Sequence, residues 1–308
     1  MLQSNKETNF ISAVVYCYNN AGEIGEFIQG LHSALDAHFQ KYEIIVVNDA
    51  STDGCTQEVR KYAEHKEKLV LSVLNMSYHQ GLEASMNAGV DLSIGDFVYE
   101  FDSTCMDFDW DLLYTIYKHS LKGYDIVSTR LDETPDFMSR VYYKLFNKYA
   151  HLPFNVGVES FRLVSRRAIN RVYSMTQTIP FRKAAYASSG LNLDVISYKA
   201  LEGYEKRRPQ RLSGVVNSLI LFTDVAYRIT LGLAAFMFLL SLSIAIYALV
   251  YRLLSNPVEG WATTVIFSSI GFGGLFAILA MVVKYLQTLV QLTFKKKDYI
   301  FESIEKLQ

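Results

Sequence analysis

Two long apolar stretches near the C-terminus constrain this 308-residue chain more than any other feature of its sequence. They run over residues 229–251 (ITLGLAAFMFLLSLSIAIYALVY) and 261–283 (WATTVIFSSIGFGGLFAILAMVV), and neither contains a charged residue. Each is about 23 residues long, which is enough for a helix to cross a bilayer with some tilt. The sequence therefore predicts a hairpin of two transmembrane helices. Two helices buried in a soluble core are the alternative.

The positive charges around these stretches predict a topology. Lysine and arginine residues lie before the first stretch (206–228) and after the second (284–297), whereas the connecting segment holds only Arg252. Because segments rich in lysine and arginine stay on the cytoplasmic side, we expect a multi-pass protein of the cell inner (plasma) membrane with both termini in the cytoplasm. The polar N-terminus lacks the apolar core of a signal peptide.

The remaining segments are organised around this hairpin. Residues 1–211 have an ordinary soluble composition and are expected to form a cytoplasmic domain, followed by an interfacial amphipathic helix (212–228), the hairpin (229–294) and a cytoplasmic tail (295–308). Gly271, Gly273 and Gly274 would let the two membrane helices pack closely. A net charge of −1 argues against a nucleic-acid partner. Three cysteines without a CxxC pair suggest neither a zinc site nor a disulfide framework.

Segments typical of strands and helices alternate in the first 211 residues. Strands are expected at 11–18, 42–49, 69–74, 95–102 and 124–130, with helical patterns between them. This alternation predicts an α/β fold, a mostly parallel sheet with helices on both faces. Ligands bind to such sheets at the carboxyl ends of the strands.

Polar residues stand where four of these strands end: Tyr18-Asn19, Asn48-Asp49, Asp102 and Arg130. An acid at the end of a buried strand needs a partner, so Asp49 and Asp102 are candidates for binding a ribose, a base or a divalent cation. For Asp53, at the start of a predicted helix, a helix cap is the simpler interpretation. The acids after Asp102 are typical of a solvated loop, but their position behind a core strand favours a ligand role for Asp102 itself.

In order and spacing, several segments resemble the family 2 glycosyltransferases, which have a GT-A fold. They are ISAVVYCYNN, YEIIVVNDASTDG, HQGLEASMNAGVDLSIGDFVYEFDS, GYDIVSTR and FRLVSRRAI, and the resemblance covers roughly residues 10–215. The branch it resembles most is that of the polyprenyl-phosphate glycosyltransferases, of the dolichol-phosphate mannose synthase and bacterial GtrB type. The pair of predicted membrane helices fits this branch.

The resemblance implies a role for each matching residue. Tyr18 and Asn19 match the P-x-Y-N-E nucleotide motif, Asp49 matches the acid that binds the base, and Glu83 matches the G-K-E-A segment. Asp102 matches the first acid of the D-x-D metal motif, and Arg130 and Ser139 match positions that bind the acceptor's phosphate. Arg162 belongs to the F-R-L motif. Arg208, Arg211 and Ser213 match the R-x-x-G-x-S-K segment near the membrane, with Arg211 in place of its glycine.

The resemblance also implies a divalent cation, Mg²⁺ or Mn²⁺, but the metal motif departs from the family pattern. D-A-D-L-Q-D appears here as Asp102-Ser-Thr104-Cys-Met106-Asp107. Threonine is a weaker ligand than a carboxylate, and a methionine sulfur suits a hard cation poorly. A metal site would therefore rest on Asp102, with Asp107 as a second candidate, and arginines are the alternative source of positive charge.

The implied reaction is an inverting transfer of a sugar from a nucleotide-sugar to a polyprenyl (undecaprenyl- or dolichyl-type) phosphate at the bilayer surface, for cell-surface glycan modification. An anionic phosphate needs no strong general base, so Asp102, Arg130, Ser139 and Arg208 are expected to position the reactants and stabilise charge. A homo-oligomer formed through the membrane helices is a further expectation. Two alternatives remain: transfer to a sugar hydroxyl, with Glu159, Asp107 or Asp109 as the base, and a catalytically silent scaffold.

Overall fold

The computed structural model describes residues 6–64, 66, 69–134, 137–149, 152–175, 179, 181–201 and 299–307, together with scattered positions between 232 and 289. The chain divides into two compact units. The first comprises Met1–Asn147, Leu152–Gln210 and Lys296–Gln308, and the second comprises Lys148–His151 and Arg211–Lys295. All the strands among the described residues belong to the first unit.

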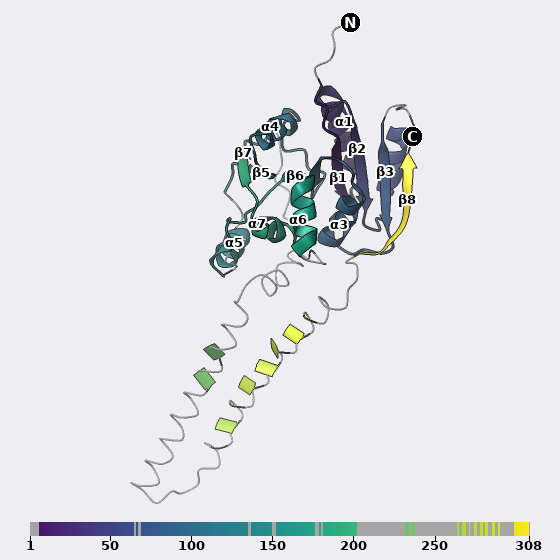
Figure 1. The fold of residues 1–308 in the computed structure, drawn as a ribbon. Helices are drawn as coiled ribbons and strands as arrows, with labels where there is room; N and C mark the ends of the chain where they lie inside the picture. The colour runs from purple at the N-terminus through teal and green to yellow at the C-terminus, as the bar shows by residue number, and fades with distance from the viewer. Residues whose placement is uncertain are drawn as a thin grey trace, which may run out of the picture. The chain divides into compact units, whose positions relative to one another are not determined.

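The first unit is built on one eight-stranded sheet with the order β7-β5-β6-β4-β1-β2-β3-β8 (Figure 1). Its strands are β1 (Ile11–Cys17), β2 (Tyr42–Asn48), β3 (Leu71–Met76), β4 (Phe97–Phe101), β5 (Ile126–Leu131), β6 (Phe161–Ser165), β7 (Leu193–Tyr198) and β8 (Phe301–Leu307). The central strands β4, β1, β2 and β3 are mutually parallel, as are β5 and β7. β6 and β8 are antiparallel to their neighbours. The predicted α/β fold with a mostly parallel sheet is confirmed.

Helices cover both faces of the sheet because the central strands are apolar on both sides. Along β1, Ile11, Ala13 and Val15 pack into one core and Val14 and Tyr16 into the other. The first core includes side chains of α1 (Ala21–His38), α2 (Cys55–Ala63) and α4 (Asp111–Ser120). The second includes side chains of α3 (Leu82–Leu92), α6 (Arg166–Met175) and α7 (Arg182–Ser188). One further helix, α5 (Phe137–Tyr149), packs Phe146 edge-on against Phe181.

The five predicted strands and the helices between them are confirmed, with ends shifted by one to two residues. α3 lies unusually close to the sheet, because a Cβ at Gly89 would come within 2.4 Å of Val14 and 2.6 Å of Val47. This close contact packs the second half of α3 directly against β1 and β2.

The sequence did not predict β8. Residues 295–308 were expected to form a tail separate from the domain, but the structure pairs Phe301–Leu307 with the edge strand β3 (Figure 1). The half-buried side of β8 carries Ser303 and Glu305 as well as Leu307, so the strand has no apolar alternation to reveal it. Its position is set instead by polar contacts: Arg60 binds Glu305 through Nε at 2.9 Å and through Nη2 at 2.8 Å.

The predicted membrane hairpin falls largely outside the described residues, as does the predicted interfacial helix at 212–228. Among the positions that are described, no helix combines the length and the apolar character that a membrane crossing requires. Within the second unit, a Cβ at Gly274 would lie 2.7 Å from the side chain of Met237. The two apolar segments thus approach each other closely at Gly274, whereas no atom of the described residues lies within 4 Å of a Cβ at Gly271.

Candidate active site at the carboxyl ends of the strands

The carboxyl ends of four parallel strands lie side by side, because β4, β1, β2 and β3 are neighbours in the sheet. They bring together Asp102 after β4, Tyr18 and Asn19 after β1, Asp49 after β2, and the 77–81 loop after β3. The sequence predicted a site at the strand ends, and the structure brings Tyr18, Asn19, Asp49 and Asp102 together there but not Arg130.

Hydrogen bonds between loops hold this edge of the sheet together. Asn19 adopts a positive φ of 51° and accepts the backbone N–H of Thr52 at 2.8 Å. Asp53 accepts the backbone N–H of Ala21 at 2.7 Å and that of Cys55 at 3.1 Å, which are the first residues of two helices. The N-cap position of the second helix is Gly54 and not Asp53, and the bond from Asp53 to Ala21 joins the loops that follow β1 and β2.

Asp49 is completely buried and organises the loop after β3. Its carboxylate accepts the backbone N–H of Gln80 at 2.7 Å and that of Gly81 at 2.8 Å. The hydroxyl of Tyr16 donates to the same group at 2.9 Å, and His79 Nδ1 lies 2.9 Å from it. His79 in turn stacks on Tyr18, with the ring centroids 4.1 Å apart. The resemblance assigned Asp49 to the base, and here its carboxylate holds the loop beside Tyr18.

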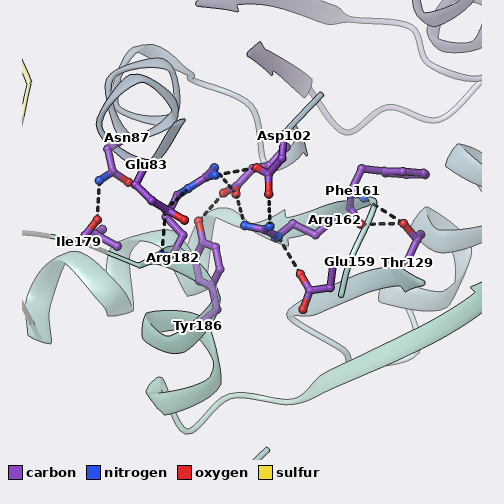
Figure 2. Close-up of polar contacts among 11 residues, drawn as sticks. Glu83, Asn87, Asp102, Thr129, Glu159, Phe161, Arg162, Ile179, Arg182 and Tyr186 are labelled. Carbon is purple, nitrogen blue, oxygen red and sulfur yellow. Dashed lines mark hydrogen bonds and ion pairs between the residues drawn. The ribbon is translucent and has the colours of Figure 1, made fainter. Parts of the chain in front are cut away.

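A buried charge network surrounds Asp102 (Figure 2). Arg182 Nη2 lies 2.6 Å from Asp102 Oδ1, and Arg162 Nη2 lies 2.7 Å from Asp102 Oδ2. Both guanidinium groups are 1% exposed, whereas the Asp102 side chain keeps 15% of its surface accessible. Of these three side chains, Asp102 is thus the one that solvent and ligands can reach.

Glu100 completes the network from beneath. It lies two residues before Asp102, so it points to the same face of the sheet, and it is directly opposite Arg162 in the β4–β6 register. Its Oε2 accepts Nη1 of Arg162 at 3.0 Å and Nη1 of Arg182 at 2.9 Å. Tyr186 of α7 donates its hydroxyl to Oε1 of Glu100. Each arginine therefore forms a fork between the same two carboxylates.

The outer end of each fork binds a further acid (Figure 2). Arg182 Nε lies 2.9 Å from Glu83 of α3, and Arg162 Nε lies 3.2 Å from Glu159. The four carboxylates stabilise both buried guanidinium charges, which burial alone would disfavour. Burial alone would also raise the pKa of Asp102, but the charges of Arg162 and Arg182 outweigh it and hold that pKa well below its ordinary value.

The donor set around Asp102 does not fit a divalent cation in this arrangement. Both oxygens of Asp102 bind guanidinium groups, and Thr104 is bonded to Asn20 and Glu23. Asp107, the second candidate ligand, is buried and accepts the hydroxyl of Tyr198 at 2.9 Å, and burial raises its pKa. Among the residues described, no group of three or more His, Cys, Asp or Glu side chains is placed to hold a metal ion. Positive charge at this point comes from the two arginines.

Some predicted site residues lie elsewhere. Arg130 is exposed at the end of β5, and Ser139 is near the start of α5. In the described part of the chain, neither makes a hydrogen bond or ion pair with the network. Arg208, Arg211 and Ser213 lie outside the described residues. Of the acids considered as bases, Glu159 binds Arg162, Asp107 binds Tyr198, and Asp109 is exposed.

Sequence reasoning missed Arg182, Glu100 and Tyr186. Glu100 carried a signal, since an acid inside the apolar strand FVYEF requires a buried partner. Arg182 and Tyr186 showed no such signal in the sequence. They lie on a short helix about 80 residues further along the chain and contact Glu100 only in the folded domain.

Comparison with known proteins identifies the family of this chain. The family model described as glycosyl transferase family 2 matches residues 12–173. The CsbB protein of Bacillus subtilis is 25% identical over 307 residues, covering 95% of this chain and 91% of that protein. The undecaprenyl-phosphate 4-deoxy-4-formamido-L-arabinose transferase of Aeromonas hydrophila is 24% identical over 226 residues, covering 70% of this chain and 68% of that protein.

Among solved structures, the mannosyltransferase PcManGT of Pyrobaculum calidifontis, in complex with GDP-Man and Mn²⁺, is 16% identical. The match covers 91% of this chain and 88% of that one, with a TM-score of 0.47. The family model alone spans more than half of the chain and includes β1 to β6 with Asn19, Asp49, Glu83, Asp102 and Arg162. The chain belongs to glycosyl transferase family 2, and it is a glycosyltransferase.

Proposed function

We propose that this glycosyltransferase moves a sugar from a nucleotide-sugar to a polyprenyl phosphate at the cytoplasmic face of the cell membrane, with inversion at the anomeric carbon. The observation that carries the proposal is the gathering of Tyr18, Asn19, Asp49 and Asp102 at the edge of the sheet where α/β proteins bind their ligands. The product would serve cell-surface glycan modification.

The donor half of the proposal rests on the strand ends. Tyr18 and Asn19 stand beside the loop held by Asp49, where a nucleoside can stack and hydrogen-bond. Arg162 and Arg182 lie behind Asp102, buried and bonded to carboxylates through all three of their nitrogens, so they would not contact the donor directly. Their charge would offset that of Asp102 beside the bound diphosphate.

The choice of a phosphate as the acceptor rests on the hydrogen-bond partners of the carboxylates that could act as a base. A sugar hydroxyl must lose a proton as it attacks, and a base would have to accept it. Glu159 and Asp107 are instead engaged by Arg162 and Tyr198, and the third candidate, Asp109, is exposed and accepts the backbone N–H of Asp111. A phosphate monoester is already anionic and needs only to be positioned. An undecaprenyl phosphate also appears in the name of the Aeromonas hydrophila relative.

The membrane location rests on the uncharged stretches at 229–251 and 261–283 and on the charge bias around them. The pairing of β3 with β8 supports an even number of crossings. Because β8 follows those stretches and completes the same sheet as β1 to β7, any membrane segment between residues 202 and 298 must return the chain to its starting side. A two-helix hairpin meets that requirement.

The test uses membranes that contain the full chain, a panel of radiolabelled nucleotide-sugars, and added undecaprenyl phosphate. We expect label to enter a lipid that extracts into organic solvent, and we expect Asp102→Asn to abolish the incorporation. Asp132→Asn, which changes an exposed acid after β5, is the matched control and should retain activity. Label that enters only a water-soluble glycan would support the hydroxyl acceptor. No label in any product would support the silent scaffold.

A further inference from the structure

The C-terminal strand contacts the loop that Asp49 organises. Ile300, the residue before β8, donates its backbone N–H to Gln80 Oε1 at 3.0 Å. Its carbonyl accepts the side-chain amide of Gln80 and the backbone N–H of Ser77, the latter at 3.2 Å. Gln80 therefore bonds to both backbone groups of Ile300, as the next residue of a strand would do.

The same loop is held from its other side by Asp49, which accepts the backbone N–H groups of Gln80 and Gly81. Gly81 has φ +90°, a backbone conformation that only glycine adopts without strain, and it leads directly into α3. The second residue of α3 is Glu83, which binds Arg182. A continuous set of contacts thus runs from Ile300 through Gln80 to Arg182 and Asp102.

We propose that Gln80 is a positioning residue that couples the C-terminal strand to the donor site, so that β8 is a working part of the catalytic domain. This proposal rests on the proposed function, which places the nucleotide-sugar at the carboxyl ends of the strands. With Gln80 bonded to Ile300, the 77–81 loop keeps His79 stacked on Tyr18 and the start of α3 in place. Without the bonds of the Gln80 side chain, the loop retains its attachment to Asp49 and the single backbone bond from Ser77 to Ile300.

β8 has its own anchors, which explains how it can hold a loop. Glu305 receives two bonds from Arg60, and Asn75 donates to both Glu305 and Ser303, at 2.9 and 3.1 Å. Tyr299 donates its hydroxyl to Asp91 near the end of α3. These contacts fix the strand independently of Gln80, so removing the Gln80 side chain weakens the hold on the loop and leaves the strand attached.

The experiment measures donor kinetics and nucleotide binding for the full chain in detergent. Gln80→Ala removes both side-chain bonds to Ile300, and Gln80→Glu keeps only the acceptor. Glu302→Ala changes an exposed residue of β8 and is the matched control. We expect Gln80→Ala to raise the donor KM, and the Kd for UDP or GDP, about fivefold to tenfold, with kcat within about twofold of the wild type. Gln80→Glu should fall between Gln80→Ala and the wild type.

The melting temperature shows whether Gln80→Ala weakens donor binding or destabilises the fold. We expect the same melting temperature for Gln80→Ala and the control. A donor KM and nucleotide Kd equal to those of Glu302→Ala would overturn the coupling while leaving the proposed function intact. A loss confined to melting temperature or to kcat would also overturn it. If the wild type bound neither UDP nor GDP and turned over no donor, the proposed function would fail, and the coupling with it.

Discussion

Arg182 Nη2 lies 2.6 Å from Asp102 Oδ1, although the two residues are 80 positions apart in the chain. The contact joins α7 to the carboxyl end of β4, and Arg162 makes the equivalent contact with the other oxygen. The acid that matches the start of the metal motif is therefore neutralised by the protein's own side chains. This arrangement makes the stability of the domain and the chemistry of its site depend on the same charges.

Removing Arg182 should destabilise the protein strongly. Arg182→Ala leaves Glu100 and Asp102 buried with only one guanidinium, and an uncompensated buried charge costs about 3–5 kcal/mol. Arg167→Ala is the control, because its side chain is 74% exposed and lies 3.7 Å from Asp125, and an exposed pair of this kind contributes about 1 kcal/mol or less. Urea denaturation measures both. Equal losses for the two variants would show that the network does not stabilise the fold.

The network should also make stability depend on acid pH. The pKa of Asp102 is held below its ordinary value of 3.8, so the unfolded chain binds this proton first. The stabilisation is complete above pH 4 and is lost as the pH falls below that value toward the pKa in the folded state. We expect the difference in unfolding free energy between wild type and Asp102→Asn to shrink between pH 5 and about pH 2. A difference that stays constant over this range would contradict the ion pairs.

The free protein should bind Mn²⁺ no better than its Asp102→Asn variant. Both carboxylate oxygens of Asp102 already bind arginines, and the two guanidinium charges disfavour a further cation at this carboxylate. Isothermal titration of Mn²⁺ into each protein, without nucleotide, measures this directly. Binding by the wild type that the variant loses would show that Asp102 exchanges its partners readily.

Two glycines should respond to alanine in opposite directions. Gly81→Ala imposes a strained φ of +90° at the start of α3 and should cost about 1–3 kcal/mol. Gly25 lies inside α1, and no atom lies within 4 Å of the position that a Cβ would take there, so Gly25→Ala should stabilise by about 0.5–1 kcal/mol through helix propensity. Thermal or urea unfolding of both variants is the measurement. A neutral Gly81→Ala would show that the 77–81 loop relaxes to another conformation.

The sequence by itself determined the elements whose signals are local. Apolar strands such as Tyr42–Asn48, and the polar residues that end them, can be identified because side-chain periodicity and caps act over a few residues. Parallel pairing then places Asn19, Asp49 and Asp102 at one edge without knowledge of the strand order. The family resemblance rests on these same segments.

Only the tertiary structure decided what those residues bind. The partners of Asp102 come from β6 and α7, and the partner of Gln80 comes from the segment before β8, 220 positions away. No periodicity predicts such contacts, because they depend on which strand edge a distant segment reaches. From the sequence alone, Ser303 and Glu305 are typical of an exposed polar tail. In the structure they bind Asn75 and Arg60. Local sequence patterns thus predict where the site lies. Long-range packing determines that Arg162 and Arg182 are the partners of Asp102.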